Sequence, residues 1–221
     1  MSERQEPRPV TPAPQTAPTA AFREVIAVGA STGGPPVVLG FLKSLRASFE
    51  VPILVAQHMP QAHVGYYAEH LQAHARRPVL LGRHGEVVQR GRVYVAPGGV
   101  HMQVVRVGSK LAIALDDGPE EHYCRPAVDP LFRSVAAACG ASSVGVVVTG
   151  MGSDGAIGAT LLRKAGAPVV VQDRQSCVVW GMPGAVVRAG AASAEVPAAE
   201  LAEVVMRWTS VDRKGSHDAT A

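Results

Sequence analysis

Short apolar runs alternate along the chain with segments in which apolar residues recur at helical spacing. Val25–Val28 and Val51–Ala56 are such runs, each of a length that suits one buried strand. Helical patterns follow them, over residues 35–47 after the first run and over 63–75 after the second. Strands that alternate with helices in this way are typical of parallel βαβ units. The first part of the chain therefore predicts an α/β sheet.

The middle of the chain has a different pattern, with three strand-like runs close together. They cover residues 92–97, 101–107 and 111–115, and the turn Gly108-Ser109-Lys110 joins the last two. Close spacing and a short turn favour antiparallel pairing. We therefore predict a small antiparallel ribbon that is inserted into, or appended to, the α/β sheet.

Alternation of helix and strand resumes in the last part of the chain. We predict helices over 129–140, 156–166 and 198–208 and strands over 144–150 and 168–172. No internal repeat is evident. The complete pattern predicts an open parallel sheet with helices between its strands.

The two ends of the chain lack this pattern. Residues 1–20 contain acids, bases and prolines without an apolar stretch, so we predict a disordered tail and no secretory signal. Residues 209–221 are equally polar and predict a flexible C-terminal tail. One domain from 21 to 208 remains. No apolar run approaches the ~20 residues of a membrane span.

Composition narrows the range of partners. Apolar residues make up 47% of the chain, which suffices for a core, whereas aromatic residues make up 5% and the net charge is only +3. A nucleic-acid-binding surface is therefore not expected. The three cysteines are far apart in the sequence, which is typical of reduced thiols in a cytoplasmic protein.

Three predicted strands end in polar side chains that a core would not need. Ser31 follows the first strand, His58 follows the second, and Asp154 follows the strand over 144–150. The carboxyl ends of parallel strands share one edge of a sheet, so these side chains should meet in one crevice. A hydroxyl, an imidazole and a carboxylate are the groups of a Ser-His-Asp triad. Singly, His58 would be read as structural and Asp154 as a helix cap, but their coincidence favours catalysis.

The glycine-rich segment 29–34 also permits other interpretations. Its backbone amides could bind a phosphate, but it matches neither the dinucleotide fingerprint nor the Walker loop. Gly29–Gly33 does fit the G-x-S-x-G nucleophile elbow of α/β-hydrolases. The order Ser31, His58, Asp154 differs from the Ser, acid, His order of that fold, which excludes a true α/β-hydrolase.

Two histidine segments raise the question of a metal site. His70 and His74 stand four residues apart on a predicted helix, and His122 lies two residues before Cys124. The first pair lacks a following glutamate and the second lacks a further cysteine pair, so we predict a solvated surface and no zinc site. No metal or other cofactor is expected.

Several segments together resemble the catalytic domain of the bacterial chemotaxis methylesterase (CheB) family, whose members are also protein-glutamine deamidases. The resemblance runs from about residue 22 to 207 and rests on these segments: "GASTGGP", "QHMP", "YVAPGGVHM", "RPAVDPLFRSVA", "VVVTGMGSDGA" and "VVVQDRQSCVVWGMPGAVVRAG". It implies a doubly wound, Rossmann-like parallel sheet with a small antiparallel ribbon. The implied activity is removal of methyl esters from receptor glutamates, without a cofactor.

The resemblance also implies roles for individual residues. Ser31 would be the nucleophile, His58 the base and Asp154 the carboxylate that orients the base. The backbone amide of Met151 would contribute to the oxyanion hole, and Thr32 would line the site and interact with the histidine. The implied partners are methylated chemoreceptor helices, which a cytoplasmic protein would meet at membrane arrays.

The sequence departs from the family in some places. Members carry an N-terminal receiver domain, whereas here only the tail 1–20 precedes the domain, so we expect activity without a phosphodonor. The segment after "QHMP" and Ala127, where serine is common, also differ and leave the receptor undefined. Two other functions stay open: a non-catalytic receptor-binding scaffold and a serine hydrolase of small esters.

Overall fold

The computed structural model describes residues 23–209. The predicted tails 1–20 and 209–221 lie outside these residues except for Thr209, which belongs to the last helix. No helix in the described part of the chain is long and apolar enough to cross a bilayer.

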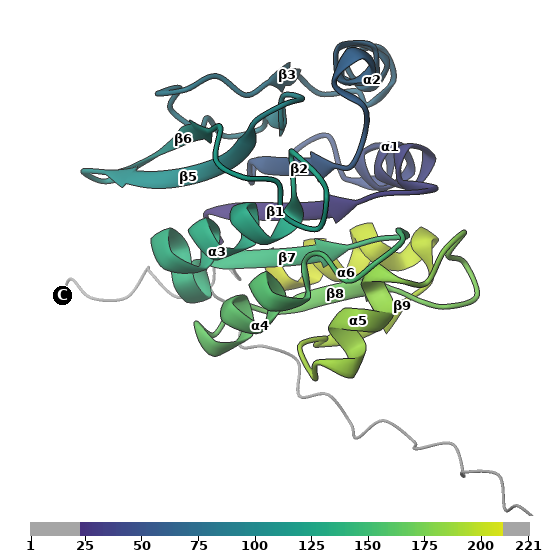
Figure 1. Ribbon diagram of the computed structural model, residues 1–221. Helices are drawn as coiled ribbons and strands as arrows, with labels where there is room; N and C mark the ends of the chain where they lie inside the picture. Colours follow the sequence, from purple (N-terminus) through teal and green to yellow (C-terminus); the bar gives the residue numbers. More distant parts are fainter. Residues whose placement is uncertain (1–22, 210–221) are drawn as a thin grey trace, which may run out of the picture.

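Seven parallel strands form the central sheet, in the order β3-β4-β2-β1-β7-β8-β9 (Figure 1). The strands are β1 (Val25–Ala30), β2 (Ile53–Gln57), β3 (Val79–Leu81), β4 (Val93–Val95), β7 (Ser143–Val147), β8 (Val169–Gln172) and β9 (Ala194–Val196). From β1 the chain first adds β2, β3 and β4 on one side, with β4 inserted between β2 and β3, and then adds β7, β8 and β9 on the other. The gap between β1 and β7 is therefore the topological switch point, where open α/β sheets bind ligands.

Helices cover both faces of the sheet. They are α1 (Gly34–Ser44), α2 (Gln61–His74), α3 (Val128–Cys139), α4 (Ala156–Lys164), α5 (Met182–Arg188) and α6 (Leu201–Thr209). Apolar residues of α1, α2 and α6 share one buried cluster with the sheet, and those of α3, α4 and α5 share another on the opposite face. The predicted doubly wound fold is confirmed.

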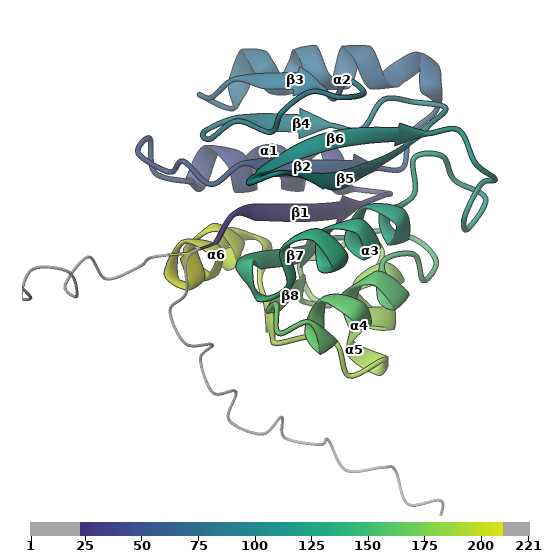
Figure 2. The same cartoon turned by 90° about the vertical axis from the view of Figure 1, so that its left-hand side faces the viewer.

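A two-stranded antiparallel ribbon, β5 (His101–Val107) and β6 (Lys110–Asp116), lies beside α3 on its face of the sheet (Figure 2). Met102 and Ile113 of the ribbon belong to the same buried cluster as Leu54 and Tyr94 of the sheet. The prediction that 92–97 belongs with these strands was wrong. β4 pairs in parallel with β2 and β3, and all its residues are buried, as in a strand covered on both faces.

Three short elements were not predicted: β3, α5 and β9. Each is of three to seven residues, too short to show a clear period in the sequence. The helix predicted over 198–208 begins as a 3-10 turn, Ala198–Glu200, before α6. The helix predicted over 35–47 ends at Ser44 because Leu45 is extended.

Candidate active site

Ser31 occupies the tight turn between β1 and α1. Its amide donates to the carbonyl of Thr149 (3.1 Å), and its own carbonyl accepts from the amide of Gly34 (2.8 Å). The turn passes through Gly33, whose φ of +79° suits glycine, and a Cβ there would lie 2.7 Å from Val178. The glycines of this segment thus allow the sharp change of direction from strand to helix that a nucleophile elbow requires.

His58 leaves the sheet next to Ser31. Ala30 of β1 pairs with Gln57 of β2. Ser31 and His58 are therefore the residues that follow this pair on the two neighbouring strands. The His58 amide donates to the Ala30 carbonyl (2.9 Å). Gln57 is buried, and its Nε2 donates both to the Ser31 carbonyl (2.9 Å) and to the His58 carbonyl (3.0 Å). The backbones that carry the hydroxyl and the imidazole are therefore tied together.

Asp154 contacts the imidazole of His58 directly. His58 Nε2 donates to Asp154 Oδ2 over 2.6 Å, and the carboxylate is only 1% exposed. An ionised carboxylate can only accept, so the proton of this bond belongs to Nε2. Nδ1 is then the His58 nitrogen that can accept a proton.

Three backbone amides also donate to Asp154. They belong to Val128 (2.6 Å), Asp129 (2.9 Å) and Gly155 (2.8 Å). Val128 and Asp129 open α3, whose N-cap residue, Ala127, has no side-chain oxygen with which to accept these amides. Asp154 thus performs the capping from a different part of the chain. The sequence offered catalysis and capping as alternative roles for Asp154, and the geometry is compatible with both at once.

A second carboxylate, Asp129, lies beside Asp154 and is fully buried. It accepts from the Gly158 amide (2.6 Å) and from His122 Nε2 (3.0 Å). Burial raises the pKa of Asp129, and the hydrogen bond from Gly158 only partly opposes this. Burial also acts to raise the pKa of Asp154, but the hydrogen bonds from His58 and the α3 amides outweigh it and leave that pKa lowered. Asp154 is therefore the carboxylate held in its ionised form.

His122, Asp129 and Asp154 form the grouping most like a metal site within residues 23–209, with ligand atoms within 4.8 Å of one another. Each carboxylate in it already accepts hydrogen bonds from the protein, so the group is built as a hydrogen-bond network. The histidine pair considered from the sequence, His70 and His74, does not belong to this grouping. His74 Nδ1 donates to the carbonyl of His70 (2.8 Å), and the two rings are 4.5 Å apart.

Met151 and Thr32, the two other residues predicted for the site, lie next to Ser31. Met151 is 67% exposed and follows Gly150, where a Cβ would be 2.7 Å from Ser31 Cβ. Within residues 23–209 the Met151 amide donates to no protein acceptor. Thr32 is exposed, and its carbonyl accepts from Thr149 Oγ1 (2.9 Å). The oxyanion role of Met151 and the contact of Thr32 with the histidine stay predictions.

The sequence pattern marked Gln57 as a polar residue at a strand end, without a role, and did not mark Gln172, Asp129 or His122 as residues that position the site. Gln57 and Gln172 each end a strand and are buried, and Gln172 Oε1 accepts from the Thr149 amide (2.8 Å). For Gln172, a glutamine at the end of an apolar strand was a signal that could have been used. Asp129 and His122 gave no such signal, because only the fold brings them to Asp154.

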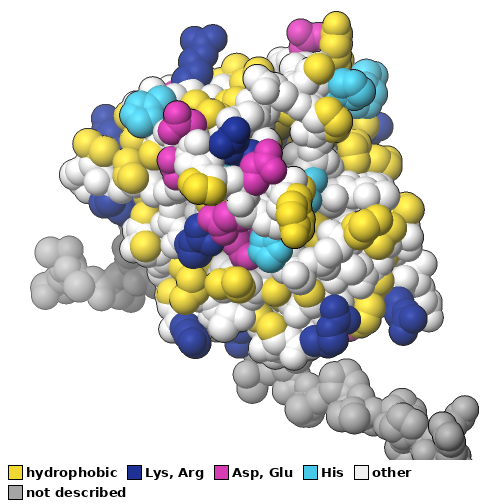
Figure 3. All heavy atoms as spheres, viewed as in Figure 1, with side chains coloured by type: hydrophobic (Ala, Val, Ile, Leu, Met, Phe, Trp, Pro, Cys, Tyr) yellow, Lys and Arg dark blue, Asp and Glu magenta, His cyan; other side chains and the backbone are white. Residues whose placement is uncertain are grey.

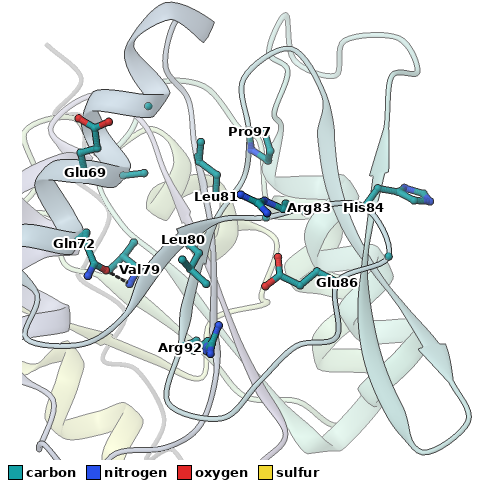
Figure 4. A pocket seen from close by; sticks show the side chains of 14 residues that line it. Glu69, Gln72, Val79, Leu80, Leu81, Arg83, His84, Glu86, Arg92 and Pro97 are labelled. Atoms are coloured by element: carbon teal, nitrogen blue, oxygen red, sulfur yellow. Dashed lines mark hydrogen bonds between the residues drawn. The ribbon is translucent and has the colours of Figure 1, made fainter.

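Of the predicted site residues, His58 lines a hollow of about 480 Å³, together with Tyr123, Cys124 and Arg125. In Figure 3, acidic, basic, histidine and apolar side chains are intermixed over the loop that precedes α3. A larger hollow of about 1010 Å³ lies between α2, β3 and the loop after β3 (Figure 4). It shares no lining residue with the first and contains none of the predicted site residues.

Comparison with known proteins agrees with the predicted resemblance. The family model described as CheB methylesterase matches residues 26–205. The crystal structure of the Thermotoga maritima CheB methylesterase catalytic domain superimposes with a TM-score of 0.82 at 33% identity. The match covers 85% of this chain and 99% of that one.

Curated relatives carry the name protein-glutamate methylesterase/protein-glutamine glutaminase. One from Rhodopseudomonas palustris (strain BisB5) is 45% identical over 190 residues, which is 86% of this chain and 49% of that protein. A second, named protein-glutamate methylesterase/protein-glutamine glutaminase 1, is from Rhodospirillum rubrum and is 40% identical over 210 residues. These residues are 94% of this chain and 53% of that protein. The chain thus spans about half the length of the curated relatives it matches.

Proposed function

The chain belongs to the CheB methylesterase family, and from that membership we propose that it hydrolyses methyl esters on glutamate side chains of chemoreceptors. The names of the curated relatives support ester hydrolysis on protein glutamates and a second activity, deamidation of protein glutamines. We further propose that the chain acts in the cytoplasm on receptors held in membrane arrays. The observation that carries the proposal is the 2.6 Å hydrogen bond between His58 and Asp154 beside the turn that holds Ser31.

In the first half of the reaction, Ser31 Oγ attacks the ester carbonyl while its proton passes to His58 Nδ1. Asp154 accepts from Nε2, which fixes the tautomer and stabilises the imidazolium that forms. The carbonyl oxygen becomes an oxyanion, for which the Met151 amide is the proposed donor. One such donor is worth about 3–4 kcal/mol in comparable sites. The tetrahedral intermediate then expels methoxide, which takes the proton from His58 and leaves as methanol.

In the second half, water attacks the acyl-enzyme on Ser31. His58 takes one proton from this water and returns it to Ser31 Oγ as the ester bond to the enzyme breaks. The products are the receptor glutamate and the free serine. With a glutamine substrate the same steps release ammonia in place of methanol, so one site serves both reactions.

Methanol release from methylated receptor membranes tests the proposal. Ser31→Ala and His58→Ala should each lower kcat by at least roughly three orders of magnitude, because a triad acts as a unit. For the same reason the double variant should be no slower than either single variant. His70→Ala is the matched control, since this histidine lies on α2 apart from the site and should leave kcat near wild type.

Two outcomes would contradict the proposal. A folded Ser31→Ala variant that still releases methanol would remove the hydroxyl from the reaction. A wild-type chain that binds receptor membranes without releasing methanol or ammonia would favour the non-catalytic scaffold.

A further inference from the structure

The loop before α3 contains a tight turn, Glu121–Cys124, with a conformation that its residues do not favour. Glu121 and Cys124 exchange both of their backbone hydrogen bonds (3.2 and 2.9 Å). The two residues between them, His122 and Tyr123, have φ of +54° and +59°. Two-residue turns with both central residues left-handed normally contain glycine, asparagine or aspartate. A histidine and a tyrosine here strain the backbone, so other contacts must maintain the turn.

Two of these contacts anchor the Glu121–Cys124 turn to α3. The Glu121 carboxylate pairs with both terminal nitrogens of Arg133 (2.7 and 2.5 Å). His122 Nε2 donates to the buried carboxylate of Asp129 (3.0 Å). The amides at the start of the same helix hold Asp154. The turn and the proposed catalytic carboxylate are therefore fixed to one rigid element.

Tyr123 gains nothing from this arrangement within the described fold. Its side chain is 97% exposed, the highest value among the exposed large apolar side chains of residues 23–209. Asparagine or glycine at this position would relieve the strain without removing any packing of the ring. The strained turn thus projects an aromatic side chain into solvent, and the reason for an aromatic residue must lie outside the fold.

The position of Tyr123 relative to the site suggests that reason. Tyr123 and His58 line the same hollow of about 480 Å³, together with Glu120 and Arg125. Hollows of this volume accommodate a drug-sized molecule, which is more than one esterified side chain. Ser31 itself does not line this hollow, but His58 does. A substrate that presents its ester to these two residues and continues past His58 would therefore pass Tyr123.

We propose that Tyr123 binds the receptor helix next to the esterified glutamate and that the rigid Glu121–Cys124 turn presents it. This inference rests on the proposed function. On a helix, residues three or four positions from the ester lie on the same face, so an aromatic ring at the edge of the hollow can pack on them. Tyrosine suits such a contact because its ring supplies apolar area at little entropic cost.

Steady-state kinetics on methylated receptor membranes test this role. Tyr123→Ala should raise KM roughly five- to thirty-fold, which is about 1–2 kcal/mol and below the range of residues at the centre of an interface, because the ring lies at the edge of the hollow. Its kcat should stay within about two-fold of wild type, because Tyr123 takes no part in the chemistry. Tyr123→Phe, which keeps the ring, should retain most of the affinity. Tyr66→Ala is the matched control, since Tyr66 is 75% exposed on α2 and does not line this hollow.

Two further measurements separate binding from structural damage. Tyr123→Asn suits the left-handed backbone, so its Tm should equal or exceed that of wild type while its KM still rises. Inactivation of Ser31 by diisopropyl fluorophosphate, a small reagent without a receptor helix, should proceed at the wild-type rate in all Tyr123 variants.

Unchanged KM in Tyr123→Ala and Tyr123→Asn would overturn the inference, as would an equal rise of KM in Tyr66→Ala. Slower inactivation by the small reagent would also overturn it, because Tyr123 would then act through the catalytic residues. These failures differ from that of the proposed function, which would appear as a wild-type chain without methanol release; in that case this inference fails with it.

Discussion

Replacement of Asp154 by asparagine is the sharpest test of the proposed site, because each carboxylate oxygen accepts two hydrogen bonds. Oδ1 accepts from the amides of Asp129 and Gly155, and Oδ2 accepts from His58 Nε2 and the amide of Val128. Either orientation of an amide side chain therefore places its NH2 group against two N–H donors. The variant cannot satisfy all four.

His58 can relieve one of these conflicts, but only at the expense of catalysis. If its proton moves from Nε2 to Nδ1, Nε2 can accept from the asparagine. Nδ1, the nitrogen proposed to take the Ser31 proton, is then already protonated. We therefore expect Asp154→Asn to lower kcat for methanol release by about 10⁴, as expected when a triad histidine is held in the wrong tautomer.

The other conflict reduces stability. The amide of Val128 is left facing an NH2 group, which costs about 1–3 kcal/mol for a buried donor. The remaining hydrogen bonds lose the contribution of an ionised acceptor. We expect the free energy of unfolding to fall by about 3–5 kcal/mol in total. Urea unfolding measures this loss, and Glu50→Gln, which changes an exposed carboxylate paired with Arg90, should cost less than about 1 kcal/mol.

The stability loss should also depend on pH. Because the folded-state pKa of Asp154 is lowered, its stabilisation is present above the ordinary value of 3.8 and is lost as pH falls through the folded pKa. The stability gap between wild type and Asp154→Asn should therefore close in acid. A variant with wild-type kcat, or a gap that persists unchanged in acid, would refute this reading of the hydrogen bonds.

Two other substitutions test the surroundings of the site. Gly150→Ala adds a methyl group 2.7 Å from Ser31 Cβ, so it should lower methanol release and reduce the free energy of unfolding in urea by about 1–3 kcal/mol. The control is Gly40→Ala, whose new Cβ would have no atom within 4 Å and should instead stabilise α1 by about 0.5–1 kcal/mol. Asp129→Asn removes a buried carboxylate whose folded-state pKa is raised, so wild type should lose stability relative to this variant as pH rises above 3.8. Unfolding measured between about pH 4 and pH 8 checks the sign. A stability difference that does not change with pH would show that burial does not act on Asp129 as described.

The sequence alone determined the class of fold and the edge of the sheet at which the candidate site lies. Runs such as Val25–Val28 and Val51–Ala56 lack polar residues because their strands are covered by helices on both faces. Polar residues can follow such strands only where the chain leaves the core. This made Ser31, His58 and Asp154 recognisable as candidates without coordinates.

The sequence was less informative where an element was short or its pairing was remote. β3, α5 and β9 are too short for a hydrophobic period to emerge. The run over 92–97 has the composition of a strand, but composition does not determine its partner. Only the folded sheet shows that β4 lies between β2 and β3 and not in the ribbon.

Tertiary structure alone decided which ionisable side chains lie close enough to share a proton or to shift in pKa. Asp154 caps α3, a helix that begins 26 residues earlier in the chain, and thereby lies beside the buried Asp129. Burial, one histidine partner and several amides then drive the pKa values of the two aspartates in opposite directions. The left-handed turn that exposes Tyr123 is likewise invisible in the sequence, because histidine and tyrosine do not favour it. These properties arise from distances between atoms that are remote along the chain, and no local pattern encodes them.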